Sequence, residues 1–275
     1  MSKLLSANFR RLVRDKKFWI SAALIFVFIL AVMFSGYGVY LRNYPDGAPM
    51  EEQYYNIFPV MGLVYSIFIT LFLGTDYSDG TIRNKLCVGH TRVNIYMANF
   101  VTAFFGALVF LLASLAAALV TIPFTAAWTM GAGQIALYTL ICVLYTAAFC
   151  GIFTLMAMLL TKKSTCAVAA IILFLLLIVS SSSAYNALCE PEITRMAEFT
   201  VNGLEVGEPT PNPDYVSGTM RVVLQGLVDF LPTGQCIQMA NMELPHPVFS
   251  MISSVIIAVL TSLAGILAFR KKDLK

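Results

Sequence analysis

The sequence predicts an all-α integral membrane protein with six transmembrane helices. Of its 275 residues, 59% are hydrophobic and only 12% are charged, whereas soluble domains are about 45–50% apolar and about 25% charged. The apolar residues also gather in runs, and a run of about 20 is long enough to cross a bilayer as a helix. We therefore expect a single transmembrane domain over residues 1–275, with little room for a separate soluble domain.

Six apolar runs have the length of a membrane span. Two of them share one stretch, from Val93 to Thr161, that contains no Asp, Glu, Lys, Arg or His and is too long for a single span. Pro123 and the turn-like residues 129–134 are expected to divide this stretch. The six predicted spans are about 18–41, 55–74, 95–122, 135–160, 166–185 and 248–269, and none of them holds an ionisable residue.

Basic residues are segregated to one side of these spans. Of the 18 Lys and Arg residues, 15 lie in the N-terminal tail, the loop between spans 2 and 3, the loop between spans 4 and 5, and the C-terminal tail. Short loops rich in Lys and Arg remain on the cytoplasmic side of a membrane. We therefore expect both termini in the cytoplasm and residues 186–247 outside the cell.

The N-terminal tail, residues 1–17, predicts a helix lying on the inner leaflet. Leu5, Phe9 and Leu12 fall on one helical face, and basic residues surround the rest. Such a helix has membrane lipid as its partner. A simple basic flank that only fixes the topology is the alternative. The long basic region and the full-length span after it do not fit a cleavable signal peptide.

Residues 186–247 form the large loop outside the membrane. Asn-Gly flanked by alternating apolar residues at 199–206 predicts a β-hairpin. Apolar residues then recur at helical spacing, which predicts a short amphipathic helix that Pro232 and Gly234 would end. This segment is either a lid or re-entrant gate over an exit path, or a surface helix packed on the spans. The candidate gate residues are Leu227, Leu231, Pro232 and Gly234.

Several classes of membrane protein are disfavoured by what the sequence lacks. The predicted spans carry none of the ionisable residues that ion-coupled carriers use. The only histidines are His90 and His246, and neither a zinc-protease motif nor a P-loop is present. We expect neither an enzyme nor a nucleic-acid partner. The six cysteines form no metal-ligand cluster, and Cys189 and Cys236 are either paired or free.

The polar insert between spans 2 and 3 predicts a short helix over residues 80–88. Asp79 is a favourable N-cap and Gly89 a favourable helix end. Ile82 and Leu86 are four residues apart and share one face. The outward face would carry Arg83, Asn84 and Lys85.

The segment "GTDYSDGTIRNKL" at 74–86 resembles the stretch after the second span in membrane subunits of bacterial type-2 ABC exporters. "DFLPTGQ" at 229–235, the N-terminal helix and the basic C-terminal tail are also similar. The family often has Glu where this chain has Asp76, which keeps the charge on a shorter side chain. The resemblance implies that the insert is a coupling helix, formed or shaped by Asp76, Tyr77, Gly80, Thr81, Arg83, Asn84, Lys85 and Gly89.

The same resemblance implies the partners and the function. The coupling helix would dock on a cytoplasmic nucleotide-binding subunit, which binds the ATP and Mg²⁺, so this chain binds no cofactor. The membrane subunit would pair with a second copy or a homologous permease in a bacterial plasma membrane. We expect an exporter of an amphiphilic cargo such as a peptide antibiotic, a lipid or a hydrophobic drug. The alternative is a non-transporting scaffold or sensor that is partnered with an ATPase.

Overall fold

The computed structural model describes residues 1–275 except 44–49, 126–127, 196, 201–202, 207 and 273–275. The helices are α1 (Ser2–Arg14), α2 (Lys16–Asn43), α3 (Met50–Tyr55), α4 (Phe58–Ser78), α5 (Thr81–Cys87), α6 (Arg92–Thr125), α7 (Ala132–Leu159), α8 (Lys163–Cys189), α9 (Gly218–Phe230), α10 (Pro232–Ala240) and α11 (Pro247–Lys271). The strands are β1 (Ile193–Thr194), β2 (Ala197–Thr200), β3 (Gly203–Val206) and β4 (Thr210–Pro211).

Six helical segments are long and apolar enough to cross a membrane. They are α2, α3 with α4, α6, α7, α8 and α11, in the order that the sequence predicts. The chain is therefore an α-helical, multi-pass membrane protein. Its strands are short and lie between α8 and α9.

The helices extend beyond several of the predicted span boundaries, and two of these differences concern residues named in the prediction. Pro123 does not end its helix, because α6 continues to Thr125. The proline removes the one N–H that would donate to the Leu119 carbonyl, but only two residues of the helix follow it, so little helix lies beyond the disturbed turn. The second span is also longer than expected: α4 continues to Ser78, so that Asp76 and Tyr77 belong to its last turn rather than to a loop.

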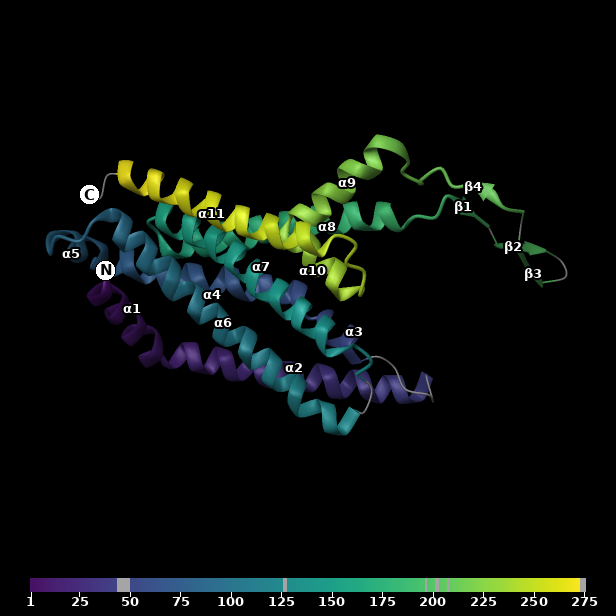
Figure 1. Ribbon diagram of the computed structural model, residues 1–275, viewed down its shortest axis with the longest axis horizontal. Helices are drawn as coiled ribbons and strands as arrows, with labels where there is room; N and C mark the ends of the chain where they lie inside the picture. The colour runs from purple at the N-terminus through teal and green to yellow at the C-terminus, as the bar shows by residue number, and fades with distance from the viewer. Residues whose placement is uncertain (44–49, 126–127, 196, 201–202, 207, 273–275) are drawn as a thin grey trace.

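The spans run side by side along the long axis of the molecule (Figure 1). One end, the terminal end, carries α1, α5 and the last turn of α11, and both chain termini lie there. The opposite end, the distal end, carries α3 and the strands β1–β4. The short helices α9 and α10 lie between α8 and α11 towards the distal end.

Helices α4 and α7 form the centre of the bundle. They are the most enclosed spans, whereas α2, α8 and α11 turn most of their surface outwards. Aromatic side chains fill the space between them, and Tyr65, Tyr145 and Phe149 are fully buried. Across the two helices, the rings of Phe58 and Tyr145 meet edge to face, with centroids 6.1 Å apart. Such ring pairs add about 0.5–1.5 kcal/mol beyond the area they bury.

The segment between α8 and α9 holds two antiparallel strand pairs. β2 pairs with β3, with Thr200 opposite Gly203 and Phe199 opposite Leu204. This is where Asn-Gly predicts a hairpin; residues 201–202, which connect the strands, lie outside the described residues. A shorter pair joins β1 to β4.

The break between α9 and α10 differs in part from the prediction. Pro232 does end α9, at Phe230, but it also begins α10 as a first-turn proline, the position at which its missing N–H costs nothing. Gly234 does not stop a helix. It lies inside α10, where a β-carbon would be 2.1 Å from the carbonyl oxygen of Val228. Glycine thus lets the two helices approach closely.

We expect Gly234→Ala to destabilise the fold because the added methyl group meets backbone that cannot turn aside. Overpacking of this kind costs about 1–3 kcal/mol. Gly226→Ala in α9 is the matched control, since a β-carbon there meets nothing within 4 Å. Thermal unfolding of the purified variants in detergent measures the difference. Equal melting temperatures for the two variants would contradict the close contact at Gly234.

Candidate functional site

The short helix α5 is bounded by two glycines in the left-handed region. Gly80, at φ 67°, is its N-cap residue, so Asp79 does not cap the helix as expected. The Asp79 carboxylate accepts a hydrogen bond from Ser78 Oγ at 3.1 Å instead. Gly89, at φ 91°, ends the helix as predicted, because its N–H donates to Leu86 and the next N–H donates to Lys85. These two bonds satisfy carbonyls that a helix end leaves free.

Asp76 lies at the centre of the terminal end and is fully buried. Its carboxylate accepts hydrogen bonds from Lys85 Nζ at 2.9 Å and Thr81 Oγ1 at 2.9 Å, and it forms an ion pair with Arg11. Arg11 comes from α1, Asp76 from α4, and Thr81 and Lys85 from α5. One carboxylate thus joins three helices. We call these four residues the Asp76 node.

Lys85 points inwards, contrary to the expectation that it belongs to the outward face of α5. Its side chain is 15% exposed. Besides Asp76, it donates to Asn8 Oδ1 at 3.1 Å. The Asn8 amide donates in turn to Asn99 on α6 at 2.8 Å. The physical reason is that a buried carboxylate requires a cationic partner, and Lys85 is within reach.

Tyr77 extends this network to the other side of the bundle. Its hydroxyl donates to the Met158 carbonyl at the end of α7, at 2.5 Å. Lys272 Nζ lies 3.0 Å from both oxygen atoms and 4.2 Å from the centre of the Tyr77 ring. Burial lowers the pKa of Lys272 from its ordinary value, because the ammonium is partly removed from water.

The start of α6 is held to the end of α11. Arg92 donates to the carbonyls of Phe269, at 2.7 Å, and Arg270, at 3.2 Å, and also to that of Lys272. A guanidinium at this place satisfies carbonyls that have no partner at a helix end. Helices α1, α4, α5, α6, α7 and α11 are therefore all tied together at the terminal end.

The outward face of α5 carries the remaining predicted residues. Arg83 and Asn84 are exposed, as is Gly89. Beside them Val88 is 78% exposed, a large apolar side chain in an otherwise polar insert. The eight predicted residues thus separate into two groups. Asp76, Tyr77, Thr81 and Lys85 join the helices, whereas Arg83, Asn84 and Gly89 face outwards and Gly80 begins the helix.

Sequence reasoning missed Asn8 and Arg11 as members of this site. The sequence placed Leu5, Phe9 and Leu12 on the apolar face of α1 that would lie on the inner leaflet, whereas the residues buried within the protein are Leu4, Asn8 and Leu12. The spacing of four between Leu4, Asn8 and Leu12 was an available signal. This spacing alone does not identify Asn8 as buried, because a polar residue is buried only where it has a hydrogen-bond partner, here Asn99.

A second cluster lies around "DFLPTGQ" in α9 and α10. Asp229 is 3% exposed. Its carboxylate accepts hydrogen bonds from the side-chain amides of Gln225, at 2.8 Å, and Gln238, at 2.7 Å, and it lies 2.8 Å from His246 Nδ1. Asp229 therefore holds α9, α10 and the start of α11 together.

Gln235, from the same motif, joins α10 to α11. Its amide donates to the Ser250 carbonyl at 3.1 Å and to Ser253 Oγ at 2.9 Å, and its oxygen accepts from Ser254 at 2.8 Å. On the other side, Thr233 donates to the carbonyl of Leu177, which lies about halfway along α8. These bonds hold α10 at the level of the spans rather than above them.

The candidate gate residues occupy different environments in this cluster. Pro232 and Gly234 are buried, and Leu231 is half-buried in the turn between α9 and α10. Leu227 is 39% exposed on α9. These gate residues lie well away from the residues of α5. The predicted site residues therefore form two separate clusters rather than one site.

An apolar cavity opens between α2, α4 and α6 near the terminal end. It measures about 370 Å³ and is lined mainly by Phe18, Val64, Ile67, Phe68, Leu71, Phe72 and Phe110. Three cations, Arg11, Lys17 and Lys163, and one carboxylate, Asp15, line it as well. An apolar interior with cationic groups beside it suits an amphiphile.

Among the described residues, no three His, Cys, Asp or Glu side chains gather as a metal site. Cys189 and Cys236 are both free, the first exposed and the second buried. No family model matches the chain, and no characterised protein matches it.

We expect Asp76→Asn to loosen α1 and α5 together, because the variant leaves Arg11 and Lys85 without a counter-charge. Breaking a buried ion pair costs about 3–5 kcal/mol, and the partial exposure of Arg11 reduces this figure. Hydrogen exchange of residues 2–14 and 81–87 measures the effect.

Asp79→Asn is the matched control, since Asp79 is exposed and three residues away on the same insert. It should leave exchange unchanged. Faster exchange in α5 with full protection in α1 would show that Asp76 does not join the two helices.

Proposed function

We propose that this protein is the membrane subunit of an ATP-driven exporter of the type-2 ABC class. The observation that carries the proposal is the construction of α5. It is a short helix outside the span helices, bounded by two glycines and held to α1 and α4 through Asp76. Its outward face offers Arg83, Asn84 and Val88 to a partner. The sequence resemblance assigns the same segment to the docking helix of such exporters.

The proposed mechanism is rigid-body motion of α5 together with the membrane-spanning helices next to it. When the ATPase subunit moves α5, the motion passes into α4 and α6, which flank it in the chain. If α5 moved relative to α1 and α4, the ion pairs of the Asp76 node would break, at a cost of about 3–5 kcal/mol. Moving the helices as one body avoids this cost. The bonds of Tyr77 and Lys272 carry the same motion to α7 and α11.

Charge supports the proposed orientation. The terminal end, where α5 lies, also carries the basic N-terminal tail, the 4–5 loop and the C-terminal tail. The positive-inside rule assigns this end to the cytoplasm. An ATPase subunit would then meet α5 on the side of the membrane where ATP is available, and the distal end would lie outside the cell.

The proposed path of the transported substrate is based on the apolar cavity near the terminal end and on helices α9 and α10. An amphiphile would enter the apolar cavity from the inner leaflet, with its anionic part near Lys17 and Lys163. The buried α10, held to α8 through Thr233, supports the re-entrant alternative over a surface helix. A change in the packing of α9 and α10 would then open the exit path.

We expect the double variant Arg83→Ala with Asn84→Ala to lose the ATPase subunit. An arginine at the centre of an interface contributes about 2 kcal/mol or more, which is more than tenfold in Kd. The measurement is co-purification with a soluble P-loop ATPase, which the proposal expects an adjacent reading frame to encode. Lys162→Ala is the control, since Lys162 is exposed at the same end and lies outside α5.

Unchanged co-purification and unchanged transport in this variant would overturn the docking role of α5. If the intact complex hydrolyses ATP in lipid vesicles but moves no amphiphile, the scaffold or sensor alternative is favoured instead. Co-purification therefore tests whether the protein binds an ATPase, and the vesicle experiment tests whether it transports a substrate.

The proposed orientation predicts which cysteine an impermeant thiol reagent reaches on intact cells. Cys189 and Cys87 are both exposed in the fold and lie at opposite ends of the bundle. In variants that retain one of the two, Cys189 should be labelled and Cys87 should react only after the cells are opened. Labelling of Cys87 alone would reverse the topology.

A further inference from the structure

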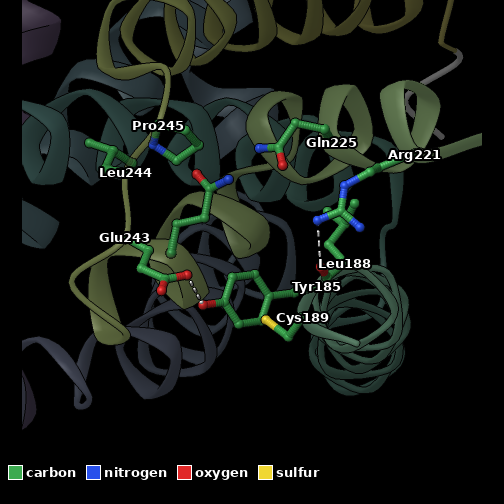
Figure 2. Close-up of a pocket in the computed structure, with 9 residues that line it drawn as sticks. Tyr185, Leu188, Cys189, Arg221, Gln225, Glu243, Leu244 and Pro245 are labelled. Atoms are coloured by element: carbon green, nitrogen blue, oxygen red, sulfur yellow. Dashed lines mark hydrogen bonds between the residues drawn. The ribbon is translucent and has the colours of Figure 1, made fainter. Parts of the chain in front are cut away.

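A polar cavity of about 600 Å³ lies at the distal end, between α8, α9, α10 and the loop before α11 (Figure 2). Tyr185, Leu188 and Cys189 line it from the end of α8, and Arg221 and Gln225 from α9. Gln238, Glu243, Leu244 and Pro245 complete the wall. The proposed exporter mechanism gives none of these residues a ligand-binding role.

The cavity holds one cation and one anion on opposite sides. Figure 2 shows Arg221 and Glu243 across the opening from each other, with Tyr185 between them. The described residues form three ion pairs, and neither Arg221 nor Glu243 belongs to any of them. Both charges are therefore available to a ligand that carries the complementary pair.

Each of the two charges is fixed by neutral neighbours. The Arg221 guanidinium donates to the Leu188 carbonyl at 2.9 Å and lies 5.4 Å from the centre of the Tyr215 ring. The Glu243 carboxylate accepts a hydrogen bond from the Tyr185 hydroxyl at 2.9 Å. Groups held in place in advance lose little side-chain entropy on binding.

Two glutamines contribute side-chain oxygens to the wall: Gln225 on α9, one turn from Arg221, and Gln238 on α10. Gln225 and Gln238 both direct their amide N–H groups to Asp229, which leaves their amide oxygens as the free atoms. The Gln238 oxygen is buried and has no partner, although the residue is 2% exposed. A buried acceptor without a donor is unfavourable, and a bound N–H donor would relieve this cost.

We propose that this cavity binds a zwitterion with a primary ammonium group and an anionic group. The ammonium lies towards Glu243 and the Gln238 oxygen and donates N–H bonds to them, and the anion pairs with Arg221. A quaternary ammonium has no N–H to donate, so it is a poorer ligand. A phosphoethanolamine lipid headgroup and a free amino acid both have the required chemistry.

The test is native mass spectrometry of the full chain in detergent, titrated with four probes. They are dihexanoyl-phosphatidylethanolamine, its acyl-free headgroup glycerophosphoethanolamine, L-alanine, and dihexanoyl-phosphatidylcholine. We expect the phosphatidylethanolamine to bind about tenfold or more tightly than the phosphatidylcholine, because only the former donates charge-assisted hydrogen bonds. Comparable binding of glycerophosphoethanolamine or alanine identifies a soluble ligand; binding of the acylated form alone identifies a lipid.

Two variants remove one charge each. Glu243→Gln keeps an acceptor for Tyr185 and should weaken binding about tenfold or more, and Arg221→Gln should do the same. Arg195→Gln and Glu208→Gln, exposed on the same loop and outside the cavity, are the matched controls and should bind as the wild type does. Melting temperatures show whether each variant is folded.

Binding by folded Glu243→Gln at the wild-type level would overturn the proposal. So would equal binding of the ethanolamine and choline lipids, or absence of binding by all four probes. The result of this ligand-binding test is independent of ATPase docking, because neither the variants nor the measurement involves α5.

Discussion

The terminal end of the protein depends on one constraint: a carboxylate that is fully buried must be paired. Asp76 belongs to the last turn of a membrane-spanning helix and has no exposed surface. Its partners come from α1 and α5, so the ion pairs and hydrogen bonds of Asp76 decide where both helices lie. Because leaving a buried charge unpaired costs several kcal/mol, these helices cannot move independently of α4.

The distal end follows the same rule with a different carboxylate. Asp229 is buried and joins α9, α10 and the start of α11 through two amides and a histidine. Between the two ends, α4 and α7 pack through aromatic rings rather than through charges. The protein thus has polar connections at each end and an apolar middle. In the proposed exporter, this division lets the ends move as bodies while the middle repacks without separating ion pairs.

Much of the fold was predictable because bilayer thickness and hydropathy act on long segments. The six spans follow from runs of apolar residues, and Gly89 ends α5 where the sequence indicates. The errors have a common cause. Asp79 does not cap α5 because α4 continues to Ser78 and Asp79 is the C-cap of that helix. Lys85 faces inwards, contrary to expectation, because it pairs with Asp76 of the preceding helix. Likewise Gly234 does not break a helix, because its role is set by the backbone of Val228.

The sequence by itself determined that six helices can cross a membrane, which end carries the positive charge, and that a short helix interrupts the chain between the second and third spans. These properties are local, since they depend on hydropathy, charge and residues close together in the chain. Only the tertiary structure decided which side of α5 is bonded inwards, which face of α1 is buried and which polar groups line the distal cavity. Each of these depends on contacts between segments that are distant in the sequence, such as Arg11 with Asp76 or Tyr185 with Glu243. Local sequence patterns do not predict such contacts.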